Sequence, residues 1–167
     1  MEGPKVVEGP EVYVFTVRTP GGLRNLASIV PPEVVSARGL SDREIVGEVL
    51  ERPETGAALD PDAFVQNPKF VELIHSVVAR HGFDQEAGRA EARRIGRGSV
   101  AVIDQRTPTP EGDVPTEDII GAFEVRDGEL VQDGYRPNPA YRLFTSRGFF
   151  QLGAALAPLL EELAGGS

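Results

Sequence analysis

The two histidines are the first candidates for chemistry, and both lie in one segment that is expected to be helical. His75 and His81 are separated by six positions, which turns a helix through about 600° and leaves the two side chains about 120° apart. Glu72 and His75 have the Glu-x-x-His spacing that can bring a carboxylate and an imidazole to one metal, but such sites need further ligands of the same kind. Because the chain also lacks cysteine, the sequence predicts no metal site and no thiol chemistry.

Other catalytic patterns are missing as well. The chain has no Gly-x-Ser-x-Gly nucleophile elbow, and its glycine pairs at Pro20–Gly22 and Gly96–Gly98 lack the pattern and the lysine of a phosphate-binding loop. We therefore assign no catalytic residue and expect no cofactor. If the protein were an enzyme, Asp104 or Glu124 near a strand end would be the expected general base.

Arginines at predicted strand ends are candidates for holding an anionic ligand. The pattern Val-x-Val-apolar-x-x-Arg-Thr-Pro occurs at residues 12–20 and again at 100–108, and it ends with Arg18 and Arg106. A third group lies in the segment 135–142, Tyr-Arg-Pro-Asn-Pro-Ala-Tyr-Arg, where tyrosine and arginine are residue types enriched at binding hot spots. The alternative for this segment is a loop that pins its tyrosines onto a sheet. The predicted ligand-binding residues are Arg18, Arg106, Arg136, Tyr141 and Arg142.

The C-terminal segment has a wide apolar face. Leucines recur at steps of four, three and four residues, as in a helix seam, and two phenylalanines and Leu160 widen the stripe. The segment either closes the core of the chain or pairs with a partner, and we expect it to contribute to both. The predicted interface residues are Phe149, Phe150, Leu152, Leu156, Leu159 and Leu163.

The elements that must position these residues indicate an α+β fold with a small, mostly antiparallel sheet covered on one face by helices. The Ser41–Glu44 sequence has the pattern of a capping box and predicts a helix that ends at Pro53. The repeated Arg-Thr-Pro ending predicts that the first two strands are neighbours in one sheet. The predicted strands are near 12–18, 99–104, 119–126 and 129–131, and the other predicted helices are near 68–81, 85–95 and 147–164, the last with an amphipathic face.

Composition limits the class of protein. The chain has 167 residues and a formal net charge of −9, and such a field repels nucleic acid and anionic membranes. No apolar run approaches the roughly 20 residues that span a bilayer, and the start of the chain does not have the form of a signal peptide. We expect one cytoplasmic domain over 1–167, with a loose lead-in at 1–10.

Two functions agree with these observations. The first is a non-enzymatic interaction protein, a subunit or adaptor that uses its C-terminal helix and the Tyr135–Arg142 loop to contact a protein partner or a second copy. The second is a small-molecule enzyme or binding protein that holds an anionic ligand with the strand-end arginines.

Overall fold

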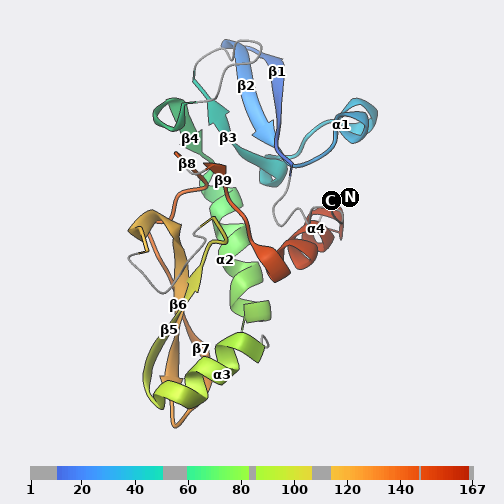
Figure 1. The fold of residues 1–167 in the computed structure, drawn as a ribbon. Coiled ribbons are helices and arrows are strands. Elements are labelled where there is room, and N and C mark those ends of the chain that lie inside the picture. Colours follow the sequence, from blue (N-terminus) through green and yellow to red (C-terminus); the bar gives the residue numbers. More distant parts are fainter. Residues whose placement is uncertain (1–10, 51–59, 83–85, 107–113, 147, 166–167) are drawn as a thin grey trace, which may run out of the picture.

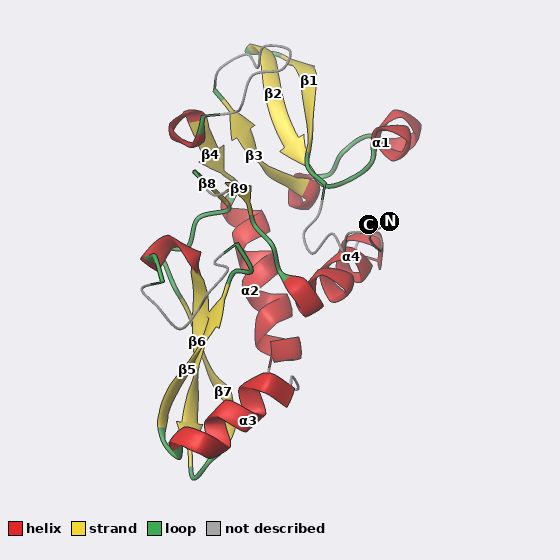
Figure 2. Ribbon diagram, in the orientation of Figure 1, coloured by secondary structure: helices red, strands yellow, loops and turns green. Residues whose placement is uncertain are grey.

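The computed structural model describes residues 11–50, 60–82, 86–106, 114–146 and 148–165. The fold is α+β, with helices and several antiparallel sheets, as predicted. A four-stranded sheet and a three-stranded sheet lie at the two ends of the molecule, and the long helix α2 runs between them (Figures 1 and 2). The predicted lead-in at 1–10 and most of the second Arg-Thr-Pro ending lie outside the described residues.

The first sheet is an antiparallel meander in the order β1-β2-β3-β4. Alternating β-branched and aromatic residues favour strand β1, and the two-residue turn at Pro20 and Gly21 reverses the chain into β2. A short helix, α1, follows β2 at Pro32–Arg38 and buries none of its residues. The strands are β1 (Tyr13–Thr19), β2 (Gly22–Ser28), β3 (Ile45–Val49) and β4 (Phe64–Gln66).

The second sheet has the order β5-β6-β7, with β5 at Gly98–Ile103, β6 at Ile119–Arg126 and β7 at Glu129–Pro137. Asp127 and Gly128 both have positive φ in the hairpin between β6 and β7, which confirms the predicted turn. The prediction that the two segments with the repeated pattern share a sheet is wrong, because β1 and β5 belong to different sheets. Each one pairs instead with a strand close to it in sequence.

Helix α2, Pro68–Gly82, begins where the Asn67-Pro68 pair predicts, and the Asn67 side chain accepts a hydrogen bond from the amide of Lys69. Its apolar face fills the centre of the main core, where Phe70, Ile74 and Val77 are fully buried. Helix α3, Glu86–Ile95, packs against β5 and β7. The chain ends with the short pair β8 (Phe144–Thr145) and β9 (Gly148–Phe149) and with helix α4 (Leu156–Gly165), which packs against α2.

Two predicted helices differ from the structure. The capping pattern at Ser41–Glu44 opens only a three-residue 3-10 turn, and the apolar run after it is strand β3. Tertiary contacts decide this outcome, because Glu44 is buried in a two-pronged ion pair with Arg38 and the following residues pair with β2. The C-terminal helix begins at Leu156 instead of residue 147, since the residues before it form β9 and a 3-10 turn.

The last strand of each of the two larger sheets is followed by an asparagine that makes the same pair of hydrogen bonds to a 3-10 turn. Asn67, which follows β4, donates two 2.8 Å hydrogen bonds: one to the carbonyl of Asp42, the first residue of the 3-10 turn Asp42–Glu44, and one to the carbonyl of Ile45, directly after the turn. Asn138, which follows β7, donates two 2.8 Å bonds in the same way around the turn Thr116–Asp118. Both asparagines precede a proline, so each Asn-Pro pair ends a strand and anchors the start of the strand next to it.

A glycine also occupies the same place in the middle strand of each unit. A Cβ at Gly47 would overlap the Phe64 ring, and one at Gly121 would overlap the ring of Tyr135. The repeated unit therefore consists of three strands, β2-β3-β4 and β5-β6-β7, with an aromatic ring on a central glycine. Strand β1 has no counterpart in the second sheet.

None of the helices in the described ranges is long and apolar enough to cross a membrane.

Candidate functional site

Arg106 lies at the centre of a buried polar network that joins the end of β5 to the C-terminal third of the chain. Its guanidinium is fully buried and lies 3.1 Å from Asp104 and 3.3 Å from Asp118. It also donates hydrogen bonds to the carbonyls of Arg142, at 2.7 Å, and Gly148, at 2.9 Å. These partners neutralise the arginine internally, so its role is to hold segments of the chain together.

Tyr141 belongs to the same network. Its hydroxyl donates a 2.7 Å hydrogen bond to Asp104, and its side chain is buried. Burial raises the pKa of the Tyr141 hydroxyl well above its ordinary value, so it stays a proton donor. Burial also raises the pKa of Asp104, while the neighbouring Arg106 opposes that shift. Arg106 and Tyr141 are thus brought together as predicted, but without exposed surface for a ligand.

The side chains of the other three predicted arginines lie outside this network and on different parts of the fold. Arg18 is exposed near the end of β1 in the first sheet, and Arg136 is exposed on β7 in the second. The Arg142 side chain is exposed, while its backbone carbonyl is held by Arg106. The structure therefore does not gather the predicted arginines into one anion-binding pocket among the described residues.

The segment 135–142 is held down by its tyrosines and Asn138. The Tyr135 hydroxyl lies 2.8 Å from Nδ1 of His75, so this side chain connects β7 to α2. Burial lowers the pKa of His75 and raises that of Tyr135, which keeps both groups neutral. Residues 135–137 belong to strand β7 instead of the predicted loop. The segment has the second geometry considered from the sequence, in which its tyrosines are fixed on the protein itself.

The C-terminal apolar face is used largely within the chain. Leu159 and Phe150 are both fully excluded from solvent. The hydrophobic cluster to which they belong includes residues from the centre of α2. Phe149 and Leu156 are partly buried against the same core, while Leu160 is 44% exposed. The described structure contains a single chain, so the predicted contact with a partner stays a prediction. The buried residues of this face are Phe150, Leu152, Leu159 and Leu163.

The first sheet has one buried face and one open face. Phe15 is paired with Leu26 across β1 and β2. Leu26 is paired with Glu48, which is paired in turn with Val65 on β4. Directly paired residues share a face, so these side chains lie on the same side of the sheet, opposite the buried Ala27, Val49 and Phe64. The apolar members of this open face are Tyr13, Phe15, Val17, Leu26 and Val65.

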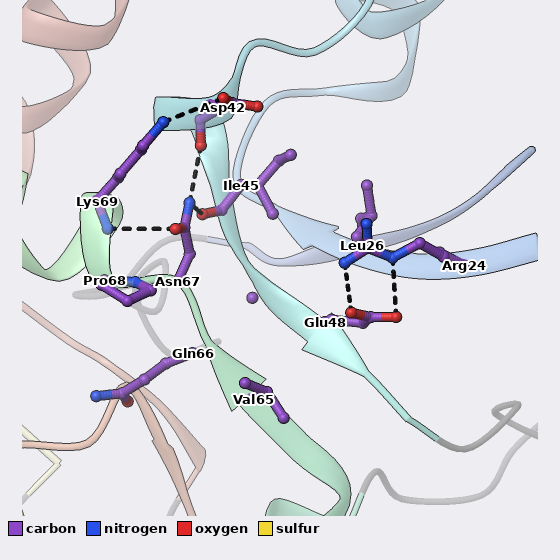
Figure 3. A pocket seen from close by; sticks show the side chains of 11 residues that line it. Arg24, Leu26, Asp42, Ile45, Glu48, Val65, Gln66, Asn67, Pro68 and Lys69 are labelled. Carbon is purple, nitrogen blue, oxygen red and sulfur yellow. Dashed lines mark hydrogen bonds and ion pairs between the residues drawn. The ribbon is translucent and has the colours of Figure 1, made fainter. Parts of the chain in front are cut away.

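A groove of about 360 Å³ crosses the open face and reaches the start of α2 (Figure 3). Arg24 and Glu48 form a two-pronged ion pair at one end, with N–O distances of 2.6 and 3.1 Å. Lys69 and Asp42 form a 3.2 Å pair at the other end. The apolar lining between these charges consists of Leu26, Ile45, Val65 and Pro68.

The charges of the groove are already paired, and this limits what it can hold. Hydrogen bonding to Arg24 lowers the pKa of Glu48, which favours its ionised form. Arg24 is therefore neutralised, so the groove offers no free arginine in its described lining to an anion. An apolar surface framed by paired charges has the composition of a protein contact.

The two edges of the first sheet differ. At the β4 edge, the Gln66 side chain accepts a hydrogen bond from the amide of Leu143 and donates one to the carbonyl of Tyr141. At the β1 edge, no strand of the described chain pairs. Strand β1 contains no proline or register shift, which are common protections of an edge strand, and its one charged residue is Arg18, near its end.

Comparisons with protein-family models, curated proteins and solved structures found no match for this chain. Within the described residues, no group of three or more histidine, aspartate or glutamate side chains is placed to hold a metal ion. The candidate site is therefore the open face of the first sheet and the edge of β1.

Sequence reasoning did not identify this surface. The alternation of Tyr13, Phe15 and Val17 was available as a signal, but alternation alone does not say which face of a strand is covered. That decision depends on α2 and the C-terminal segment, which pack on the other face.

Proposed function

We propose that this chain is a non-enzymatic interaction protein, a subunit or adaptor that binds a protein partner with the open face of its first sheet. The observation that supports the proposal most directly is the exposure of apolar side chains on this face: Val65 is 54% exposed, and Tyr13, Phe15, Val17 and Leu26 are partly exposed. Contiguous exposed apolar side chains beside polar residues are typical of protein contacts.

The positions of the predicted ligand-binding residues in the fold favour this function over the anionic-ligand alternative. Arg106 and Tyr141 are occupied by internal partners, and the remaining predicted arginines do not converge. The exposed Leu160 of α4 can extend the contact surface that the sequence predicted for the C-terminal helix. The main contact, however, is proposed for the first sheet.

Site-specific photocrosslinking in the native host tests this proposal. A photoreactive amino acid at Val65 should yield a discrete crosslinked protein species, because this side chain is exposed within the groove. The matched control places the same amino acid at Ala90, an exposed position on α3. The proposal fails if Val65 gives no crosslinked species, or if Ala90 gives the same species with equal yield.

A further inference from the structure

At its outer edge, the backbone of β1 carries hydrogen-bonding groups that no strand of the described residues pairs with. Thr19 and Gly22 close the two-residue hairpin between β1 and β2 and form a hydrogen-bonded pair. Hydrogen-bonded and non-hydrogen-bonded pairs alternate along an antiparallel ladder, so the odd-numbered residues of β1 bond to β2. The residues that direct their amide and carbonyl groups to the open edge are Val14, Thr16 and Arg18.

We infer that a second copy of this chain pairs with this edge, β1 against β1 in antiparallel register centred on Phe15. The pairing joins two four-stranded sheets into one of eight strands. It rests on the proposed function, because the edge of β1 belongs to the candidate site, and it names a second copy as the partner of that edge. A two-fold axis perpendicular to the sheet relates the copies, so both open faces lie on the same side.

The side chains of β1 complement themselves in this register. The two Phe15 side chains meet at the axis, and Tyr13 of each copy lies opposite Val17 of the other. Pairs of aromatic residues, and of aromatic with β-branched residues, stabilise neighbouring strands. On the opposite face, Val14 lies across from Thr16 and exchanges backbone hydrogen bonds with it.

Charges at the strand ends agree with the same register. Arg18 of one copy lies opposite Val12 of the other, and Glu11 lies across from Thr19 on the other face of the sheet. The two Arg18 residues are offset by six positions, roughly 20 Å along the strands. Like charges at the strand ends are thus far apart, which limits the repulsion between two chains that each carry a net charge of −9.

The oligomeric state of the purified full chain gives the first test. Native mass spectrometry and light scattering should show a dimer of 17.9 kDa chains that dissociates on dilution. Thr16→Pro removes an outward amide from each copy and should raise the dimer dissociation constant at least about tenfold. The matched control Thr16→Val keeps the amide and should remain dimeric.

The absence of cysteine from the natural chain allows a second test of the register. Directly opposite residues of a non-hydrogen-bonded pair have Cα atoms about 4.5 Å apart, which is within the range of a disulfide. Phe15→Cys should therefore form a disulfide-linked dimer on mild oxidation. Val17→Cys should not, because the two Val17 residues are about 14 Å apart along the strands in this register.

The results separate this inference from the proposed function. A wild-type chain that stays monomeric at high concentration overturns the inference, but the function stands if Val65 still crosslinks to another protein. A dimer that Thr16→Pro leaves intact, or one in which Val17→Cys crosslinks as well as Phe15→Cys, also overturns it. If Thr16→Pro unfolds the chain, Phe15→Lys decides, because it should separate the copies without removing a backbone amide.

Discussion

Replacing Tyr141 with phenylalanine should destabilise the protein more than any other loss of a single hydroxyl in the described core. The substitution deletes the 2.7 Å hydrogen bond to Asp104 and leaves the ring in place. A hydrogen bond to a charged group contributes about 1.5–3 kcal/mol. For a chain of this length, each kcal/mol lowers Tm by about 2–4 °C, so the expected decrease is about 3–12 °C.

Urea unfolding followed by circular dichroism, together with thermal unfolding, measures this effect. Tyr135→Phe is the matched control, because it removes a hydroxyl from a half-buried site whose partner is the neutral His75. It should cost about 0.5–1.5 kcal/mol. If Tyr141→Phe unfolds at the same urea concentration as the wild type, or loses less stability than Tyr135→Phe, the Tyr141–Asp104 hydrogen bond does not stabilise the buried network as expected.

Three further outcomes follow from the packing and the pKa shifts. Gly121→Ala should destabilise the chain by about 1–3 kcal/mol in urea unfolding, because its Cβ would overlap the Tyr135 ring. The lowered pKa of His75 means that the unfolded chain binds this proton more readily, so the free energy of unfolding should rise with pH up to about pH 6.5. A pH series of urea titrations should show a smaller rise for His75→Gln. Leu159→Ala should cost about 2–5 kcal/mol because the side chain is fully buried, whereas Leu160→Ala should stay within about 0.5 kcal/mol; equal effects would contradict the packing of α4.

Local signals in the sequence predicted much of the secondary structure. The Asn67-Pro68 start of α2, the spacing of its apolar residues and the turn at Asp127-Gly128 each depend on neighbouring residues, and each was confirmed. The 3-10 turn at Ser41–Glu44 shows the limit of such reasoning. A capping pattern satisfies the first amides of either a helix or a 3-10 turn, and long-range pairing with β2 selected the strand that follows.

The candidate site was harder to predict because it depends on which surfaces remain uncovered. The sequence pattern around Arg106 correctly indicated a strand end, but the two acidic partners that bury this arginine come from separate elements. The sequence patterns around Arg106 and Arg18 are alike, yet Arg106 is buried and Arg18 is exposed. The burial of a charged residue is decided by where its counter-charges lie in the fold, and sequence spacing does not contain that information.

The network around Arg106 has a consequence for the order in which a growing chain can fold. Asp104, Arg106 and Asp118 are synthesised before Tyr141 and Gln151. The Tyr141 hydroxyl and the Gln151 backbone amide both donate hydrogen bonds to Asp104. Until those later residues leave the ribosome, burying the charged groups without their partners costs more free energy than leaving them hydrated. The end of β5 must therefore wait for the C-terminal segment. A nascent chain that stalls before Tyr141 would therefore keep this part of the second sheet open.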